Sequence, residues 1–168
     1  MSSMLKTFTA KLLLHRSQYR RFLSKVEANP PQNLDIIAEV LDKEVWREID
    51  CLACSNCCRS MTPTYTFQDL KRISTHFRMN IKSFKEKWLY KDKKGAWMNK
   101  FLPCQFLDLN TNKCSIYAIR PADCAGFPHL TKKKTVDYIH VHKQNIQFCP
   151  ATFRFIEKLM NNIKVNTG

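Results

Sequence analysis

Apolar positions near the beginning of the chain recur every three or four residues, the spacing of one face of an α-helix. They are Leu5, Phe8, Leu12, Tyr19, Leu23 and Val26. We expect a helix from about residue 5 to 27, ended by Pro30 and Pro31, because proline lacks the amide hydrogen that a continuing helix needs.

A second apolar face starts near Asn33. It consists of Leu34, Ile37, Leu41 and Val45. This second helix is acidic, whereas the first 26 residues carry six lysines and arginines and no acid. Because opposite charges attract, we expect the second helix to pack against the first.

Capping signals mark further helices. Thr66 with Asp69 three residues later is typical of a capping box. Asn80 can cap the next helix, and Pro150 suits the first position of a final one. The buried face of that final helix should comprise Phe153, Ile156, Leu159 and Ile163.

Residues 101–109 and 114–117 favour strands, and the turn-forming residues 110–113 lie between them. This arrangement predicts a β-hairpin. We also expect residues 138–141 to add a strand.

The predicted hairpin has a consequence for two cysteines. If Leu109 faces Cys114, then Cys104 lies about 17 Å along the strand from Cys114. The two could share one small site only if Pro103 breaks the strand.

These patterns predict an α+β protein, a mostly helical single domain with a small β-hairpin and a cysteine-rich metal-binding loop region. A length of 168 residues suits about one domain. We expect residues 1–48 to form an N-terminal helical segment packed on the core and residues 49–168 to form a cysteine-cluster metal-binding domain, in one compact unit.

The composition, with 44 % apolar and 25 % charged residues, is ordinary for a globular protein. No apolar run approaches the ~20 residues of a membrane span, no secretory signal is visible, and a cytoplasmic location is expected. Twenty-eight Lys and Arg against fourteen Asp and Glu give a formal charge of +14, which would attract polyanions such as nucleic acid.

The cysteines indicate a specific chemistry. Four of the eight stand in the stretch CLACSNCC, as C-x2-C-x2-C-C, and the others follow singly. They are Cys51, Cys54, Cys57, Cys58, Cys104, Cys114, Cys124 and Cys149. A disulfide framework needs an oxidising compartment, of which the sequence gives no sign. Clusters this dense favour metal binding.

The spacing leaves zinc and iron open. Structural zinc usually takes two short cysteine pairs, and this chain offers such a pair only before residue 58. C-x2-C-x2-C with a remote fourth cysteine is typical of [4Fe–4S] clusters. Because neighbouring side chains diverge, we expect Cys57 and Cys58 to serve different centres, or one to bind and the other to pack. Eight cysteines allow two four-thiolate sites.

Other candidate functional residues are weaker. His129 could replace a cysteine, and His140 and His142 would face the same way on a strand, but a surface or hydrogen-bonded imidazole is the interpretation we prefer for each. Lysines interleave with aromatic residues over 87–100, as on a surface that stacks nucleic-acid bases, although a solvated face is simpler. With three glycines, the chain has no phosphate-binding loop, and we predict no catalytic residue.

The cysteine pattern resembles that of the YkgJ-type cysteine-cluster proteins, a family described as zinc- or iron-chelating. The resemblance rests on CLACSNCC, PCQFLDLNTNKCSIYAIRPADCAGFP and FCP, and runs from about Asp50 to Pro150. It implies that all eight cysteines are candidate ligands of a metal ion or cluster, which is zinc or iron and includes [4Fe–4S] as an option. It also implies that Arg120 fixes the loop or offsets thiolate charge, and that Tyr117 packs beneath the site.

A related motif in flagellin lysine methylases, which look like iron–sulfur proteins, favours iron. This chain is much shorter and shows no separate substrate domain. The predicted function is therefore a zinc- or iron-chelating protein with a structural or redox role. An iron–sulfur enzyme that modifies a protein or small molecule, and a zinc-stabilised nucleic-acid-binding accessory protein, stay open as alternatives. The protein or small-molecule partner is unknown.

Overall fold

The computed structural model describes residues 3–163. It is mostly helical, with a small three-stranded antiparallel sheet and a cysteine-rich region, so the predicted fold class is confirmed. Contacts within the chain divide it into two units, Met1–Cys54 with Pro128–Gly168, and Ser55–Phe127. None of the helices in the described range combines the length and apolar character that crossing a bilayer requires.

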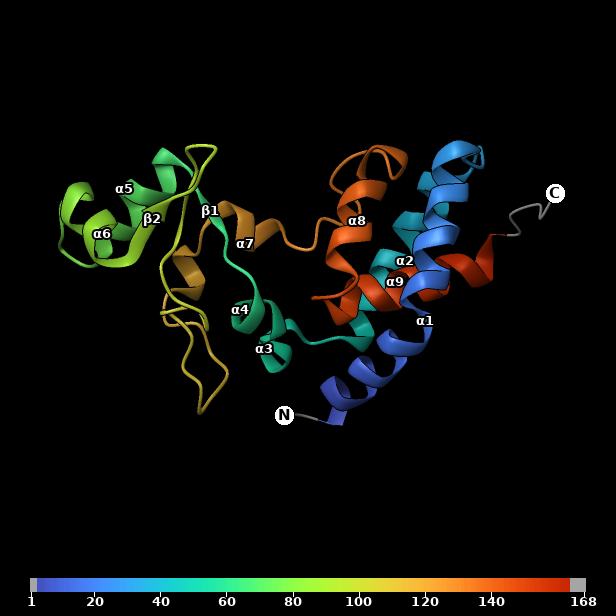
Figure 1. The fold of residues 1–168 in the computed structure, drawn as a ribbon, viewed down its shortest axis with the longest axis horizontal. Helices are drawn as coiled ribbons and strands as arrows, with labels where there is room; N and C mark the ends of the chain where they lie inside the picture. The colour runs from blue at the N-terminus through green and yellow to red at the C-terminus, as the bar shows by residue number, and fades with distance from the viewer. Residues whose placement is uncertain (1–2, 164–168) are drawn as a thin grey trace. The chain divides into compact units, whose positions relative to one another are not determined.

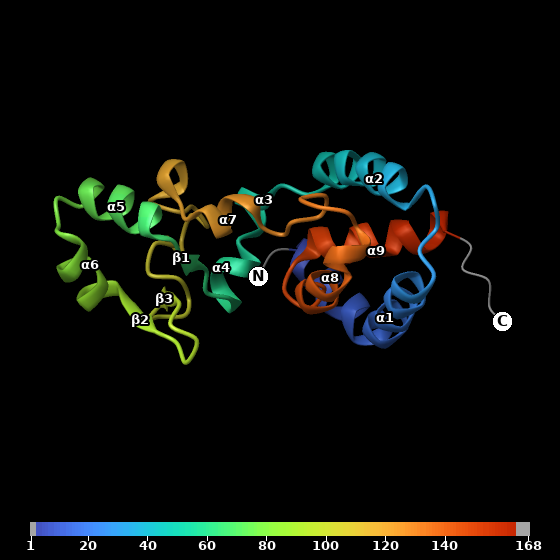
Figure 2. The same cartoon turned by 90° about the horizontal axis from the view of Figure 1, so that it is seen from above.

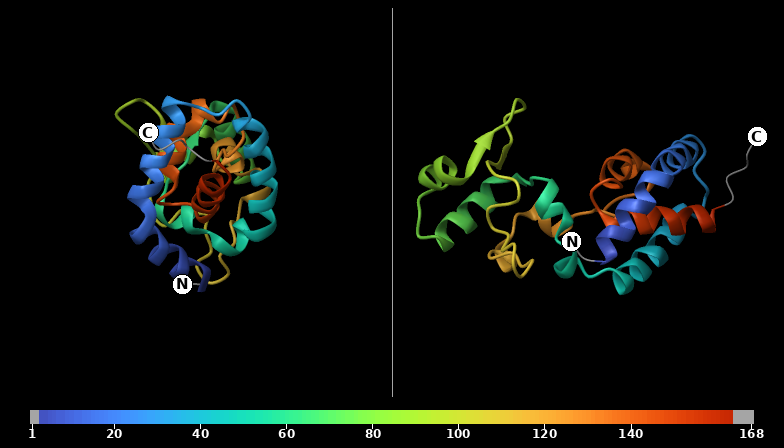
Figure 3. Two further views of the ribbon diagram at one scale, coloured as in Figure 1. Left: turned by 90° about the vertical axis from the view of Figure 1, so that its right-hand side faces the viewer. Right: turned by 60° about the horizontal axis from the view of Figure 1, so that its bottom comes forward.

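The first unit is built around helix α9 (Pro150–Asn162). This helix lies between α1 (Ser3–Ala28) and α2 (Leu34–Glu48), as Figure 2 shows. Helix α8 (Ile139–Asn145) packs on α1 and α9 (Figure 3). A 3₁₀ helix (Val136–Tyr138) precedes α8, and the one-turn helix α3 (Cys51–Cys54) follows α2.

The apolar faces predicted for these helices form the core of the first unit. Pro150 opens α9 as expected, and Phe153, Ile156, Leu159 and Ile163 are all buried. On α1 the predicted positions are buried apart from Leu12, which is half-buried. These helices therefore fold together because each must cover an apolar stripe.

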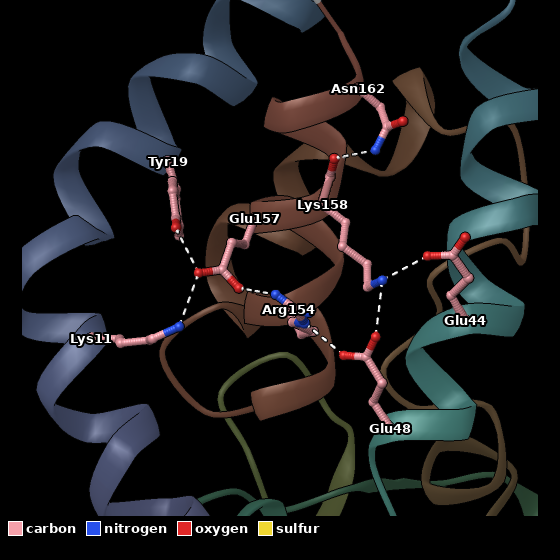
Figure 4. A network of polar contacts seen from close by, with 8 residues as sticks. All are labelled: Lys11, Tyr19, Glu44, Glu48, Arg154, Glu157, Lys158 and Asn162. Atoms are coloured by element: carbon pink, nitrogen blue, oxygen red, sulfur yellow. Dashed lines mark hydrogen bonds and ion pairs between the residues drawn. The ribbon is translucent and has the colours of Figure 1, made fainter.

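The acidic helix α2 finds its positive partners on α9, not on α1 (Figure 4). Lys158 Nζ lies 2.6 Å from Glu44 and 2.9 Å from Glu48, and Arg154 Nε lies 2.6 Å from Glu48. The first helix contributes Lys11, 3.2 Å from Glu157 of α9. The predicted packing of α2 directly on α1 is therefore wrong. Helix α9 carries charges of both signs, and both α1 and α2 pack against it.

The second unit holds the sheet and the remaining helices (Figure 1). In chain order they are α4 (Asn56–Ser60), β1 (Thr64–Tyr65), α5 (Phe67–His76), α6 (Ile81–Trp88), β2 (Leu89–Lys91), β3 (Trp97–Asn99), a 3₁₀ helix (Tyr117–Ile119) and α7 (Ala122–Gly126). Strand β3 is central, with Met98 opposite both Thr64 and Tyr90. Aromatic rings fill the core, where Phe106 stacks with Phe77 and Phe84.

The capping signals act as predicted. The Thr66 hydroxyl accepts from the Asp69 amide and the Asp69 carboxylate accepts from the Thr66 amide, which completes the capping box of α5. The Asn80 side chain accepts from the Ser83 amide at the start of α6. Both elements begin where the sequence places them.

The predicted hairpin over residues 101–117 forms only in part. The chain reverses there, but a single bridge pairs Leu107 with Cys114, two residues away from the predicted register. Pro103 has no amide hydrogen, and the Cys104 amide donates to the Cys58 carbonyl instead of to a cross-strand partner. The hairpin with regular strands is β2–β3, whose tip is the turn at Gly95.

The strand predicted over residues 138–141 is wrong, because Tyr138 ends a 3₁₀ helix and Ile139 begins helix α8. Ile139, His142 and Ile146 are buried and follow helical spacing, which decides the conformation once α8 packs on α9. His140 and His142 consequently do not face the same way: His140 is exposed and His142 is fully buried.

Candidate metal centre

The stretch CLACSNCC folds as two short helical turns, α3 and α4, with Ser55 between them. Ser55 has φ 46°, in the left-handed region that residues other than glycine rarely adopt. The break separates the motif: Cys51 and Cys54 belong to the first unit, and Cys57 and Cys58 to the second.

Ser55 of this stretch and Arg59, which directly follows it, bind the loop that precedes Cys114. The Ser55 hydroxyl donates to Asn112 Oδ1 at 3.2 Å, and the Arg59 guanidinium donates to the same oxygen. Asn112 itself has a positive φ of 60°. These bonds hold the cysteine motif against the turn, two residues before Cys114.

Backbone and carboxylate contacts place the other two cysteine segments of the second unit. The Cys104 amide donates to the Cys58 carbonyl at 2.8 Å. Asp123, the residue before Cys124, accepts from the backbone amide of Thr64 at 3.0 Å. The Ala122 amide donates to the buried Asp69 at 3.1 Å. Segments distant in sequence are thereby joined around the small sheet.

The thiols of Cys58, Cys104, Cys114 and Cys124 form one electrostatic group. In each of the six pairs, the charge of one thiol affects the pKa of the other. Burial, and after it the neighbouring thiols, raises the pKa of Cys104 to about 11 and raises that of Cys124 as well. Burial likewise raises the pKa of Cys114. A cation among them would favour the thiolate forms that burial disfavours.

Cys57 and Cys58 do not diverge, so that expectation is wrong: their sulfur atoms lie 4.0 Å apart. Two thiolates on one tetrahedral zinc, with Zn–S of about 2.3 Å, stand about 3.8 Å apart, so this spacing would also suit two ligands of one ion. The hydrogen bond from Cys57 lowers the pKa of Cys58 to about 7, against the opposing effect of burial. Cys58 is thus the thiol of the group that ionises most readily.

The other three cysteines belong to the first unit. Cys51 is exposed, while Cys54 and Cys149 are buried. Burial raises the pKa of Cys149 to about 11, with a smaller contribution from the charge of Cys54. The charge of Cys54 therefore acts on Cys149, although the two residues lie far apart in the sequence.

The four thiols are donors of the kind that a thiophilic metal takes. Within residues 3–163, no three Cys, His, Asp or Glu side chains stand close enough together to hold a metal ion. Soft thiolates select zinc or iron over hard cations such as magnesium. Binding at the four-thiol group therefore requires its side chains to close in.

Sequence reasoning missed the residues that support these thiols. Asn99, at the end of β3, is buried and places its side-chain nitrogen 3.2 Å from the Cys104 sulfur. Asp69, taken only as a helix cap, also bonds the Ala122 amide. Asn99 would have stood out as a polar residue at a buried position of a strand. Strand β3 itself was not predicted, so this signal was not available.

The other residues singled out from the sequence have defined positions. Arg120 donates to the Tyr117 carbonyl at 2.7 Å and, as a minor effect, lowers the pKa of Cys114, consistent with its expected role. Tyr117 is 39 % exposed under the Arg120 guanidinium, so the expectation that it packs beneath the site is wrong. His129 belongs to the first unit, beside Tyr138, whereas Cys124 belongs to the second.

The lysine- and aromatic-rich segment is partly covered. Lys85 and Lys87 place their ammonium groups 4.5 Å from the ring centre of Trp97 and 4.7 Å from that of Trp88. Both indoles also pack partly on the core of the second unit. Cation–π contacts and core packing thus already occupy much of these rings.

Comparison with known proteins adds one finding. A family model, CxxCxxCC, described as a "putative zinc- or iron-chelating domain", matches residues 50–150. No solved structure matches the chain. The matched range is more than half of the 168 residues and contains all eight cysteines. The chain therefore belongs to the CxxCxxCC family, as the resemblance of its cysteine pattern predicted.

Proposed function

We propose that this protein holds zinc or iron on the thiolates of Cys58, Cys104, Cys114 and Cys124, in a structural or redox role. The metal is either a single ion or a cluster such as [4Fe–4S]. The observation that carries this proposal is that hydrogen bonds join the four cysteine segments within one unit: the Cys104 amide donates to the Cys58 carbonyl, Arg59 binds Asn112 near Cys114, and Asp123 next to Cys124 accepts from Thr64. The mutual effect of the four thiols on their pKa values agrees with this arrangement.

The chain's own residues supply the conditions for binding. Cys58, whose pKa is about 7, provides a thiolate at neutral pH to which a metal ion can first attach. The three half-buried thiols, Cys104, Cys114 and Cys124, would bind as thiolates and so release their protons when a metal is bound. Arg59 and Arg120 lie beside Cys58 and Cys114 and offset part of the remaining negative charge.

The four remaining cysteines complete the predicted set of eight ligands. Cys54 and Cys149 form a second pair in the first unit, with Cys51 one helical turn from Cys54. We include these three and Cys57 as candidate ligands. Because such thiolates need reducing conditions, we place the protein in the cytoplasm.

Purification without oxygen, followed by elemental analysis and a visible spectrum, tests the proposal. Broad visible absorption with iron indicates a cluster, and zinc with no visible absorption indicates a zinc site. We expect at least one equivalent of metal per chain. A folded protein that contains no metal after anaerobic purification and takes up neither zinc nor iron would overturn the proposal.

Metal binding should also be coupled to folding, because the ligands come together only in the folded chain. A chelator should lower the melting temperature of the protein. The alternatives of an iron–sulfur enzyme and of a nucleic-acid accessory protein gain no separate support from the site.

A further inference from the structure

Asn99 lies beside Cys104, one of the four thiols of the group. It ends strand β3, is 3 % exposed, and is paired with Leu89 across the sheet. Its backbone amide donates to the Thr62 hydroxyl at 2.8 Å. The residue is thus held firmly by its backbone, independently of what its side chain does.

The side chain of Asn99 connects a polar network to the Cys104 sulfur. Its Oδ1 accepts from the Tyr65 hydroxyl at 2.6 Å and from Gln105 Nε2 at 2.9 Å. Its Nδ2 lies 3.2 Å from Cys104 Sγ. Both ends of the amide therefore have partners.

The network defines which end of the amide faces the sulfur. The Trp88 carbonyl, which can only accept, lies 3.4 Å from Gln105 Nε2 and so fixes that nitrogen as the donor. The Asn99 atom that meets Gln105 Nε2 must then be the oxygen. The NH₂ group therefore faces the Cys104 sulfur, to which it can donate.

We propose that Asn99 is a positioning residue of the metal centre, which donates an N–H···S hydrogen bond to the Cys104 thiolate and fixes its direction. This inference rests on the proposed metal site. Metal ligands commonly have such a supporting hydrogen bond from a residue that does not touch the metal. In iron–sulfur proteins, hydrogen bonds to sulfur also tune the reduction potential.

The surroundings of Tyr65 support the same geometry. Burial, and after it the charges of Cys104, Cys124 and Cys114, raises the pKa of the Tyr65 hydroxyl. The charges of three of the four thiols therefore act on the hydroxyl that anchors Asn99. Since its proton is retained, it can keep donating to Asn99 Oδ1 when the thiols ionise.

Two substitutions and one control test the role of Asn99 in the full-length protein, with Co²⁺ as the metal probe under anaerobic conditions. Asn99→Asp keeps the acceptor for Tyr65 and Gln105 but removes the donor and adds charge. Asn99→Leu removes both. Thr62→Val disturbs the backbone contact of Asn99 without touching its side-chain amide.

We expect both Asn99 variants to bind Co²⁺ about 10- to 100-fold more weakly than the unchanged protein. We also expect the sulfur-to-cobalt charge-transfer band to move to longer wavelength, because a thiolate without its hydrogen bond holds its electrons less tightly. Thr62→Val should leave the band position unchanged, whatever its melting temperature.

The outcomes distinguish failure of the role proposed for Asn99 from failure of the proposed metal site. If Asn99→Asp binds Co²⁺ as tightly as the unchanged protein, with the same band, Asn99 has no such role. If both Asn99 variants lose only thermal stability, the residue is structural and the inference is wrong. If the unchanged protein shows no cobalt–thiolate band, the metal site itself fails, and the inference with it.

Discussion

The backbone amide of Cys104 donates a hydrogen bond of 2.8 Å to the carbonyl oxygen of Cys58. This bond joins the cysteine motif to the next cysteine along the chain without involving either thiol. A serine at position 104 should keep the bond and remove only the sulfur, so the effect on metal binding can be separated from the effect on folding.

Replacing Cys104 by serine should release Cys58, Cys114 and Cys124 from metal together. Metal-bound thiolates resist alkylation, so mass mapping of alkylated peptides before and after metal loading reports which cysteines are bound. We expect all three to lose protection in Cys104→Ser. A Cys51→Ser protein is the matched control: Cys51 is an exposed thiol of the other unit and a candidate ligand outside the four-thiolate set, so its loss should leave Cys58, Cys114 and Cys124 protected. Continued protection of Cys58, Cys114 and Cys124 in Cys104→Ser would contradict the four-thiolate set.

Acid should destabilise the first unit through His142. Both ring nitrogens of this fully buried side chain lack a hydrogen-bond partner among the described residues. Burial, and then the charges of His140 and His129, lowers its pKa to about 4. The unfolded chain, with a histidine pKa of about 6.5, therefore takes up a proton that the folded chain refuses, and stability falls as the pH drops below about 6.5.

His142→Leu should remove this dependence. We expect its stability at pH 7.5 to lie within about 1 kcal/mol of the unchanged protein, because the substitution also removes two unpaired polar atoms. Between pH 6.5 and pH 5 the unchanged protein should lose about 1–2 kcal/mol more than the variant. Urea unfolding at several pH values measures both quantities. His76→Gln, at an exposed histidine of the second unit, should keep the original slope; a slope that persists in His142→Leu would exclude His142 as its source.

Asp69 should stabilise the second unit above pH 4. Its carboxylate accepts from the Thr66 amide and hydroxyl, from Arg72 and from the Ala122 amide. Burial raises its pKa, but these bonds outweigh burial and hold the pKa below its usual value. The stabilisation is therefore present above the unfolded pKa of about 3.9 and is lost as the pH falls further.

Asp69→Asn should cost about 1–3 kcal/mol at pH 7, because an amide cannot satisfy all of these donors. The difference from the unchanged protein should shrink below pH 3. Thermal unfolding at the two pH values measures it. Asp137→Asn, at an exposed aspartate, should have little effect at either pH. An equally stable Asp69→Asn protein at pH 7 would refute this account.

The charges between α2 and α9 should contribute a small, salt-sensitive stabilisation. Glu48 contacts both Arg154 and Lys158 (Figure 4), but its side chain is 38 % exposed. Glu48→Gln should therefore cost only about 0.5–1 kcal/mol at low salt and almost nothing in 1 M NaCl, where charges are screened within about 3 Å. Glu39→Gln, at an exposed position on the same helix, is the control. A loss in Glu48→Gln that salt does not change would point to packing instead.

The sequence predicted the elements whose determinants are local. Apolar spacing placed α1, α2 and α9, and the capping residues Thr66 and Asn80 placed the starts of α5 and α6. It failed where tertiary contacts decide: residues 138–141 became helical against α9, and Cys104 turned its amide to Cys58. The predicted hairpin placed Leu109 opposite Cys114, whereas Leu107 lies there. This error of two residues lengthened the expected separation of Cys104 and Cys114 along the strand and argued against a shared site.

For the site, the cysteine pattern predicted the chemistry and the family, but not the grouping. The placement of Cys58 with Cys104, Cys114 and Cys124 depends on long-range bonds through Asn112, Asp123 and Asp69. No short motif encodes those bonds. The ligand roles of all eight cysteines, and the division of the chain into residues 1–48 and 49–168, stay predictions.

Ser55 divides the family motif between the two units of the chain. Because one of the two chain boundaries between the units falls next to this left-handed residue, CLACSNCC is also one of the two covalent connections between them, the other being Phe127–Pro128. Excising either unit at its boundary would cut the motif in half, so dissection of the chain into fragments cannot isolate it. A glycine at position 55, which adopts that backbone angle freely, would change the stiffness of the connector while leaving every sulfur in place.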